Sequence, residues 1–287
     1  MSTLNNPHAQ FDDKLQAAFE QNILAALLED VGSGDLTGKL VPGDTRVTAR
    51  VIVREAAVLC GAPWFEGVML AIDQDTEIEW HYAEGDMMTA DSTVCTIVAN
   101  PRSLLTAERG ALNFMQLLSG VASATRRYVD VVAGTNAAIL DTRKTLPGLR
   151  LAQKYAVRVG GGKNQRMALY DGILIKENHI AAAGGVTAAL QAAAALDAGV
   201  PVQIEVETIA QLEEALATGV KSVLLDNFDL DMMRRAVQVN GGRALLEASG
   251  GINMDTVRAI AETGVDRISI GSLTKDVRAT DYSLRIV

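Results

Sequence analysis

The sequence predicts an α/β fold made of two unlike parts. From Ala137 onward, six short apolar runs alternate with glycine-punctuated segments of helix length. Runs this apolar are typical of parallel strands buried on both faces, and repeated strand-then-helix units indicate a parallel sheet. Six units are fewer than the eight of a complete barrel, so we expect an incomplete, TIM-like α/β barrel. A doubly wound open sheet is the alternative.

The first part of the chain has a different pattern. Apolar residues recur at every fourth position over residues 11–30 and predict a helix there. Alternating runs over residues 45–99 predict strands, interrupted by a short helix near 63–72 and a turn at 84–86. Residues 103–133 predict either one long helix or two helices separated by a break near Gly120. The tail DYSLRIV has strand character. We expect a first domain over 1–115, a barrel over 116–275, and a tail, 276–287, that returns to the first domain.

Length and composition set broad limits on the protein. The 287 residues, 48% of them hydrophobic, suit two domains or one barrel with an appendage. No run of eighteen apolar residues occurs, so no membrane span is expected. The polar start, MSTLNNPHAQ, lacks the pattern of a signal peptide, which predicts a cytoplasmic protein. Cys60 and Cys95 have no metal-binding or redox spacing and are expected to be buried, inert thiols.

The overall charge narrows the class of ligand. A net charge of −9 argues against nucleic acid as a partner. On such an acidic protein, a local cluster of Lys and Arg indicates a small anionic ligand.

Polar residues gather at the carboxyl ends of the six predicted strands, which is where α/β barrels and open α/β sheets bind ligands. Exposure of strand ends to water would explain polar residues at one or two strand ends, but it is a poor explanation for all six. The six ends are Asp141–Lys144, Lys176–His179, Glu205 with Glu207, Asp226–Asn227, Glu247–Gly251 and Gly271–Ser272.

Glycines at the last two strand ends indicate a phosphate site. Ser249, Gly250 and Gly251 follow the fifth strand, and Gly271 and Ser272 follow the sixth. Backbone N–H groups in such turns, with the start of the next helix, bind anions. A single Gly-Gly pair would be weak evidence, but two glycine signals on consecutive late strands favour phosphate.

Cations collect near the first two strand ends. Arg143, Lys144, Arg166 and Lys176 belong to segments that meet there, and arginine suits planar carboxylates. Each alone would be a solvated surface charge. Together they would repel one another unless an anion neutralised them.

Two acidic residues end neighbouring predicted strands. Glu205 and Asp226 could bind Mg²⁺, directly or through water, or accept hydrogen bonds from ribose hydroxyls. A salt bridge to Lys144 or Lys176 is the alternative.

At these residues the sequence resembles the quinolinate phosphoribosyltransferase family, also called nicotinate-nucleotide pyrophosphorylase (carboxylating). The resemblance covers nearly the whole chain, and its most specific stretch is DTRKTLPGLRLAQKYAVRVGGGKNQR at 141–166. The other motifs follow in family order: EDVGSGDLT at 29–37, AERGALNFMQLLSG at 107–120, LIKENH at 174–179, IEVET at 204–208, LLDNF at 224–228, LEASGGI at 246–252 and VDRISIGSLTKD at 265–276.

The resemblance implies an N-terminal α/β sandwich and an incomplete barrel. It also implies a homodimer, or a higher even oligomer, whose subunits share active sites. The implied reaction joins quinolinate to phosphoribosyl pyrophosphate with Mg²⁺ and yields nicotinate mononucleotide, pyrophosphate and CO₂, a step of NAD biosynthesis.

The resemblance also implies roles for individual residues. Quinolinate would be held by Arg143, Arg166 and Lys176, with Arg109 reaching it from the partner subunit. Lys144, Glu205 and Asp226 would surround the ribose, pyrophosphate and Mg²⁺. The predicted catalytic residues are Lys144, Lys176, Glu205 and Asp226; Thr142, Gln165 and Lys275 complete the substrate-binding set, and Ser249, Gly250, Gly251, Gly271 and Ser272 would hold the 5′-phosphate.

Three positions depart from the family pattern. Gln165 stands where the family usually has His, which puts one quinolinate contact in question. Gly110 replaces a frequent Thr, and Lys275 stands where some members carry His. Both of these resemble tolerated variation.

Three rival functions remain at this point. A Schiff-base aldolase would use Lys176 or Lys144 as its nucleophile. A nicotinate-specific transferase would need fewer cations. A non-catalytic phosphate-binding module would leave the charges at the strand ends without a purpose.

Overall fold

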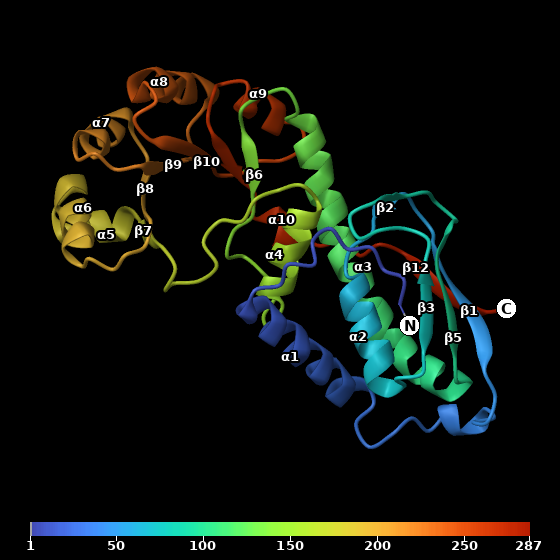
Figure 1. The fold of residues 1–287 in the computed structure, drawn as a ribbon. Helices are drawn as coiled ribbons and strands as arrows, with labels where there is room; N and C mark the ends of the chain where they lie inside the picture. Colours follow the sequence, from blue (N-terminus) through green and yellow to red (C-terminus); the bar gives the residue numbers. More distant parts are fainter. Residues whose placement is uncertain (1) are drawn as a thin grey trace. The chain divides into compact units, whose positions relative to one another are not determined.

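The computed structural model describes residues 2–287 and contains two compact units, each considered by itself below (Figure 1). The first unit comprises residues 2–126, 145–161 and 273–287. The second comprises residues 127–144 and 162–272. Among the described residues, no helix is long and apolar enough to cross a membrane.

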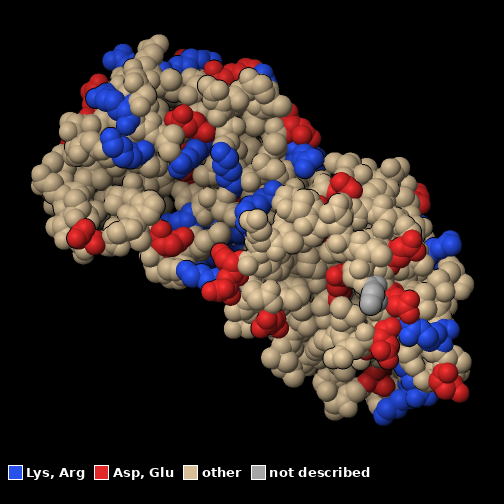
Figure 2. All heavy atoms as spheres, viewed as in Figure 1, with Lys and Arg blue, Asp and Glu red and all other residues tan. Residues whose placement is uncertain are grey.

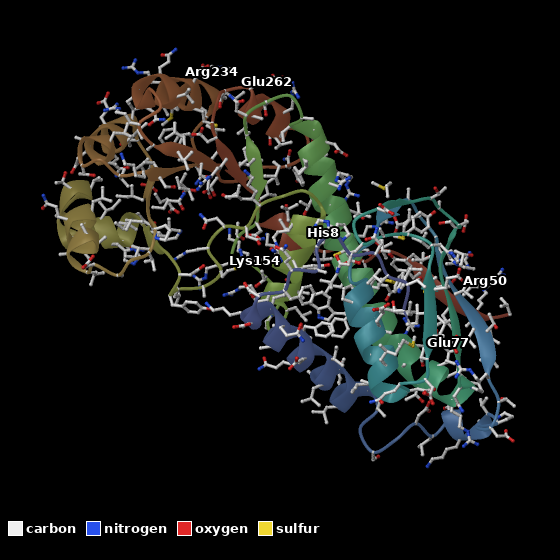
Figure 3. All side chains as sticks on the ribbon, in the orientation of Figure 1. His8, Arg50, Glu77, Lys154, Arg234 and Glu262 are labelled. Carbon is white, nitrogen blue, oxygen red and sulfur yellow. The ribbon has the colours of Figure 1, made fainter. Side chains whose placement is uncertain are left out.

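The first unit is built around a four-stranded antiparallel sheet. Its strands alternate between buried and exposed positions, as expected for a sheet with one face on the core. Arg50 and Glu77 project from its solvent face (Figure 3). In order across the sheet the strands are β12 (Tyr282–Ile286), β1 (Val47–Val53), β5 (Thr93–Ala99) and β3 (Glu77–Trp80), and β2 (Ala57–Val58) pairs separately with β4 (Met87–Met88).

Helices complete the first unit. The helix predicted over 11–30 is α1, and the Asp12 side chain caps it by accepting a hydrogen bond from the Leu15 N–H at 2.8 Å. Its apolar side joins an aromatic cluster that includes Phe19, Trp64 and Tyr155. The helices are α1 (Asp13–Asp30), the 3₁₀ turn η1 (Gly38–Leu40), α2 (Ala62–Ile72), α4 (Arg150–Val159) and most of α3 (Pro101–Val131), while α10 (Ser272–Lys275) begins in the second unit.

Helix α3 decides between the one or two helices expected over residues 103–133. A single helix is present, because α3 runs unbroken from Pro101 to Val131. Gly120 instead permits a close approach. A Cβ at this position would lie 2.4 Å from the Arg278 carbonyl oxygen, so only glycine lets that backbone segment pack against the helix.

The second unit is a six-stranded parallel sheet, as predicted. Neighbouring strands follow chain order, except that the first strand pairs with the last. This cyclic order is that of a barrel, whereas a doubly wound sheet reverses its order. In the described chain β6 and β7 are not joined, so the barrel is incomplete. Across the sheet the strands are β6 (Ala138–Leu140), β11 (Arg267–Ser269), β10 (Leu245–Ser249), β9 (Ser222–Asp226), β8 (Val202–Val206) and β7 (Ile173–Ile175).

Helices follow most of these strands. As Figure 1 shows, they lie outside the sheet. Because the strands are parallel, all of their carboxyl ends lie on one side. The helices are α5 (Glu177–Ala183), α6 (Val186–Ala195), α7 (Ile209–Ala217), α8 (Leu230–Asn240) and α9 (Val257–Ala261).

The register shows which side chains share a face. Glu205 pairs with Leu224, Leu224 with Glu247, and Glu247 with Arg267. Partners in parallel register project to the same side of the sheet, and Glu247 is fully buried. This row therefore faces the barrel interior.

Candidate active site

An ion pair links the carboxyl ends of β7 and β8. Lys176 directly follows β7, and its Nζ lies 2.9 Å and 3.3 Å from the two carboxylate oxygens of Glu205. The Glu205 side chain is only 10% exposed, whereas that of Lys176 is 45% exposed. The ammonium group is thus anchored at one side and still accessible to a ligand.

The Glu205 carboxyl is partly buried and has other negative charges near it at this edge of the sheet. Burial raises the pKa of the Glu205 carboxyl, and the charges of Asp226 and Glu177 raise it further. The hydrogen bond and charge of Lys176 oppose this rise, but the pKa stays above its ordinary value. A further cation near Glu205 and Asp226 would relieve their repulsion.

The ends of β9 and β10 are in register. Asp226 pairs with Ser249, so the carboxylate on β9 and the start of the Ser249–Gly251 turn lie side by side. Gly250 and Gly251 have φ of +107° and +59°, a conformation that glycine adopts without strain. The turn can therefore direct backbone N–H groups toward an anion.

The ends of β6 and β11 meet in the same way. The Thr142 hydroxyl accepts a hydrogen bond from the Lys144 N–H at 3.0 Å. A Cβ on Gly271 would lie 3.0 Å from Lys144 Cδ and 3.6 Å from Thr142 Oγ1. The stem of Lys144 therefore packs against Gly271, next to Ser272 at the start of α10.

The side chains of Gln165 and Arg166 make their hydrogen bonds away from the carboxyl ends of the strands. Gln165 Nε2 donates to Gln203 Oε1 at 2.7 Å and to both oxygens of Glu247 at 3.3 Å. An Arg166 guanidinium nitrogen donates to the Gly172 carbonyl at 3.0 Å. Burial, followed by the charge of nearby Arg143, lowers the Arg166 pKa.

Arg109 and Lys275 belong to the first unit. Both side chains are exposed, Arg109 on α3 and Lys275 at the end of α10. Lys275 lies 3.5 Å from an Asp276 carboxylate oxygen.

A cavity of about 1110 Å³ opens at the opposite end of the sheet. Its lining includes the first residue of each of the six strands, together with Gln165 and Arg166. Ligands of α/β barrels bind at the carboxyl ends of the strands instead. The ion pair, carboxylates and glycine turns at that end therefore identify the candidate site better than the cavity does.

Comparison with known proteins agrees with the resemblance. The family description "Quinolinate phosphoribosyl transferase, N-terminal domain" matches residues 35–119, and the corresponding C-terminal description matches residues 121–285. The chain belongs to this family.

Individual members of the family are similar over nearly their whole length. The probable nicotinate-nucleotide pyrophosphorylase [carboxylating] of Bacillus subtilis is 38% identical over 260 residues, covering 90% of each chain. The Mycobacterium leprae protein is 42% identical, covering 93% of this chain and 96% of its own. The structure of the nicotinate-nucleotide pyrophosphorylase from Francisella tularensis superposes with a TM-score of 0.93 at 40% identity, covering 98% of this chain and 99% of that one.

Three buried polar residues of this family member received no role from the sequence, although Asp141 and Glu247 stand in strand-end segments named there. Glu247 and Asp141 are fully buried, and Gln203 is 8% exposed. Gln203 Nε2 donates to Glu247 at 2.9 Å, and the Gln165 N–H donates to Asp141 at 2.9 Å. The signal was present in the sequence, since Gln203 lies two positions before Glu205 and shares its side of the strand.

The predicted Mg²⁺ site rests on two carboxylates, those of Glu205 and Asp226. Among the residues that the structure describes, no three His, Cys, Asp or Glu side chains gather as a metal-binding group. Mg²⁺ commonly takes one or two protein carboxylates and completes its shell with substrate phosphates and water. The adjacent carboxylates of Glu205 and Asp226 fit that kind of binding.

Proposed function

We propose that this protein transfers the phosphoribosyl group of phosphoribosyl pyrophosphate to quinolinate, releasing pyrophosphate and CO₂ and forming nicotinate mononucleotide. The observation that carries the proposal is the family match over both domains, with about 40% identity to curated members. The reaction is a step of NAD biosynthesis. Cations, carboxylates and glycine turns at one end of the parallel sheet support it.

We assign recognition of quinolinate to Lys176, Arg143 and Arg166, with Arg109 contributed by a second subunit. In this structure Arg166 lines the cavity at the amino ends of the strands, so its part requires the segment that carries it to turn toward Lys176 when substrate binds. The half-exposed ammonium of Lys176, held by Glu205, supports its part in this assignment. Gln165 is bonded within the barrel interior, so its contribution to quinolinate recognition is best pictured as indirect, through the segment that carries Arg166.

We assign the phosphoribosyl group to the remaining strand ends. The turn Ser249–Gly251 and the pair Gly271–Ser272 would bind the 5′-phosphate through backbone N–H groups. Lys144, packed against Gly271, would lie beside the phosphate groups, with Thr142 fixing its backbone. The part of Lys275, which belongs to the first unit, stays a prediction from the sequence.

The chemistry follows from these assignments. The quinolinate ring nitrogen attacks the anomeric carbon while the bond to pyrophosphate breaks, and positive charge develops on the ribose as in glycoside cleavage. The carboxylates of Glu205 and Asp226 stabilise this charge. The ring nitrogen then carries a positive charge, so the electron pair that departing CO₂ leaves on the neighbouring carbon is stabilised. That carbon takes a proton from water, which completes nicotinate mononucleotide. Positioning by the cations supplies much of the rate.

Mg²⁺ would be held by Glu205 and Asp226, directly or through water. When bound, it would supply neutralisation of the pyrophosphate charge. Burial raises the pKa of Glu205 and the Asp226 charge adds to the rise, so a cation bound by both carboxylates would relieve their repulsion.

We also propose a homodimer, or a higher even oligomer, with shared sites. The first unit exposes large apolar side chains that a second copy would cover. Leu24 is 59% exposed, Leu28 67%, Leu36 79% and Leu40 83%. Cytoplasmic location stays a prediction from the sequence.

One experiment tests the proposed activity. Purified protein is incubated with quinolinate, phosphoribosyl pyrophosphate and Mg²⁺, and CO₂ release is followed alongside nicotinate mononucleotide formation. We expect both products in equal amounts and little turnover with nicotinate. Turnover of nicotinate in preference to quinolinate would refute the proposal. Trapping of a substrate adduct by borohydride would instead support the aldolase alternative, which the ion-paired state of Lys176 disfavours.

A further inference from the structure

Asn227, which has no role in the assignments above, connects two parts of the candidate site. Its backbone N–H donates to the Ser249 carbonyl at 3.0 Å, which extends the β9–β10 ladder one residue beyond Asp226. Its side-chain Nδ2 donates to Asp226 Oδ2 at 2.9 Å. One residue is therefore bonded both to a strand-end carboxylate and to the start of the glycine turn.

The backbone of Asn227 is in a conformation that most residues avoid. Its φ is +55°, and only two other non-glycine residues in the described chain, Asp91 and Asp197, have positive φ. Asn is among the residues that adopt this left-handed conformation most readily, but it still costs free energy. Of the three, Asn227 alone directly follows a strand of the parallel sheet. Strain retained at such a position indicates a functional constraint.

The side chain of Asn227 is also fitted to Gly250. A Cβ on Gly250 would lie 2.1 Å from Asn227 Oδ1 and 3.1 Å from the Asn227 backbone nitrogen. The amide therefore occupies the space that a side chain at position 250 would need. One end of the amide bonds Asp226, and the other packs on the turn that we assign to phosphate.

We propose that Asn227 is a positioning residue for phosphoribosyl pyrophosphate. Its amide N–H fixes the orientation of the Asp226 carboxylate and leaves the second carboxylate oxygen for the ribose or a cation. Its carbonyl side sets the Ser249–Gly251 turn against β9. This inference rests on the proposed function, because it assumes that these strand ends bind the phosphoribosyl group.

The substitution Asn227→Gly tests the inference. Glycine adopts the same backbone conformation without strain, so the fold is preserved while both side-chain contacts are lost. Asp197→Gly is the matched control, because it relieves positive φ (+43° at Asp197) in an exposed loop of the same unit. Calorimetry measures the binding of phosphoribosyl pyrophosphate with Mg²⁺, and separately that of quinolinate. Steady-state kinetics then give KM for each substrate.

We expect Asn227→Gly to weaken phosphoribosyl pyrophosphate binding about tenfold, which corresponds to roughly 1.4 kcal/mol. Its KM should rise in parallel, quinolinate affinity should be unchanged, and Asp197→Gly should behave as the wild type. Unchanged phosphoribosyl pyrophosphate affinity in Asn227→Gly would overturn the inference. So would an equal loss of quinolinate affinity, which would indicate a general structural defect.

Different results would refute the proposed function and the proposed role of Asn227. Absence of CO₂ release by the wild-type protein refutes the proposed function, whatever Asn227→Gly does. Equal binding by wild type and variant refutes only the role of Asn227. A wild-type protein that binds no phosphoribosyl pyrophosphate would refute both.

Discussion

Replacing Lys176 by methionine tests whether its ammonium group contributes more to quinolinate binding than to folding stability. Methionine keeps the length of the side chain but removes the ammonium group that lies 2.9 Å and 3.3 Å from the Glu205 oxygens. Because the Lys176 side chain is 45% exposed, the ion pair contributes at most about 1 kcal/mol to folding. A charge-assisted hydrogen bond to a substrate carboxylate contributes more, roughly 1.5–3 kcal/mol. We therefore expect quinolinate Kd to rise roughly 10- to 100-fold in a variant that stays folded.

The remaining carboxylate gives this variant a pH signature. Without Lys176, the already raised pKa of Glu205 should rise further, because the interactions that lower it are gone. A carboxyl with a raised pKa favours the folded state below its unfolded pKa, ordinarily 4.5, and this stability is lost as pH rises through the folded value. The difference in Tm between wild type and Lys176→Met should therefore be larger at pH 8 than at pH 5. Adding Glu205→Gln should remove that dependence.

Calorimetric titration of quinolinate and thermal unfolding at the two pH values measure these effects. Lys221→Met is the matched control, since Lys221 is an exposed lysine directly before β9, at the opposite end of the sheet. It should change neither property. A Lys176→Met protein that binds quinolinate normally but unfolds much more easily would refute the assignment.

Four further outcomes are expected. Activity should disappear in excess chelator and return with Mg²⁺, and full turnover without free metal would exclude the metal. Mixing inactive Arg109→Ala with inactive Lys176→Ala subunits should restore some activity, since some hybrid sites carry neither lesion; no recovery despite demonstrated exchange would mean that Arg109 acts within its own chain or has no part in the site. Burial raises the pKa of Glu84 to about 7, so its contribution to stability, greatest below pH 4.5, is lost as pH rises toward 7; Glu84→Gln should flatten this part of the Tm profile, and an unchanged slope would contradict the cause. Gln165→His introduces an imidazole that becomes charged below its reference pKa of about 6.5; quinolinate KM should tighten below that pH if the segment turns toward Lys176 when substrate binds, and identical pH profiles for both proteins would show that position 165 stays bonded to Gln203 and Glu247.

The parallel sheet was predictable because its signal is local. Each of the six apolar runs became a strand, and the charged residue after β7, Lys176, lies at the carboxyl end as periodicity alone indicated. The cyclic order of the strands was harder to predict. It depends on β6 pairing with β11, two segments more than a hundred residues apart, which the sequence indicates only through the count of units.

The orientation of single side chains was less predictable. Gln165 was expected beside a substrate carboxylate, and its amide is instead bonded to Gln203 and Glu247. Buried polar groups need hydrogen-bond partners. Which partner each group finds depends on how neighbouring strands pack, and the sequence alone does not determine this. The alternative of a salt bridge between Lys176 and Glu205 was left open by the sequence, and the structure shows it formed.

The position of β12 has a consequence for how this chain is made. The central strand β1 needs β12 as its neighbour on one side, and Tyr282 of β12 places its hydroxyl 2.8 Å from Ser119 in the core of the first unit. Every residue of the parallel sheet lies between these partners in the chain. During synthesis the parallel sheet can therefore close while β1 still exposes an unpaired edge. Such edges attract other chains, so chaperone dependence should be greatest late in translation, and a truncation before β12 should aggregate even though the second unit is intact.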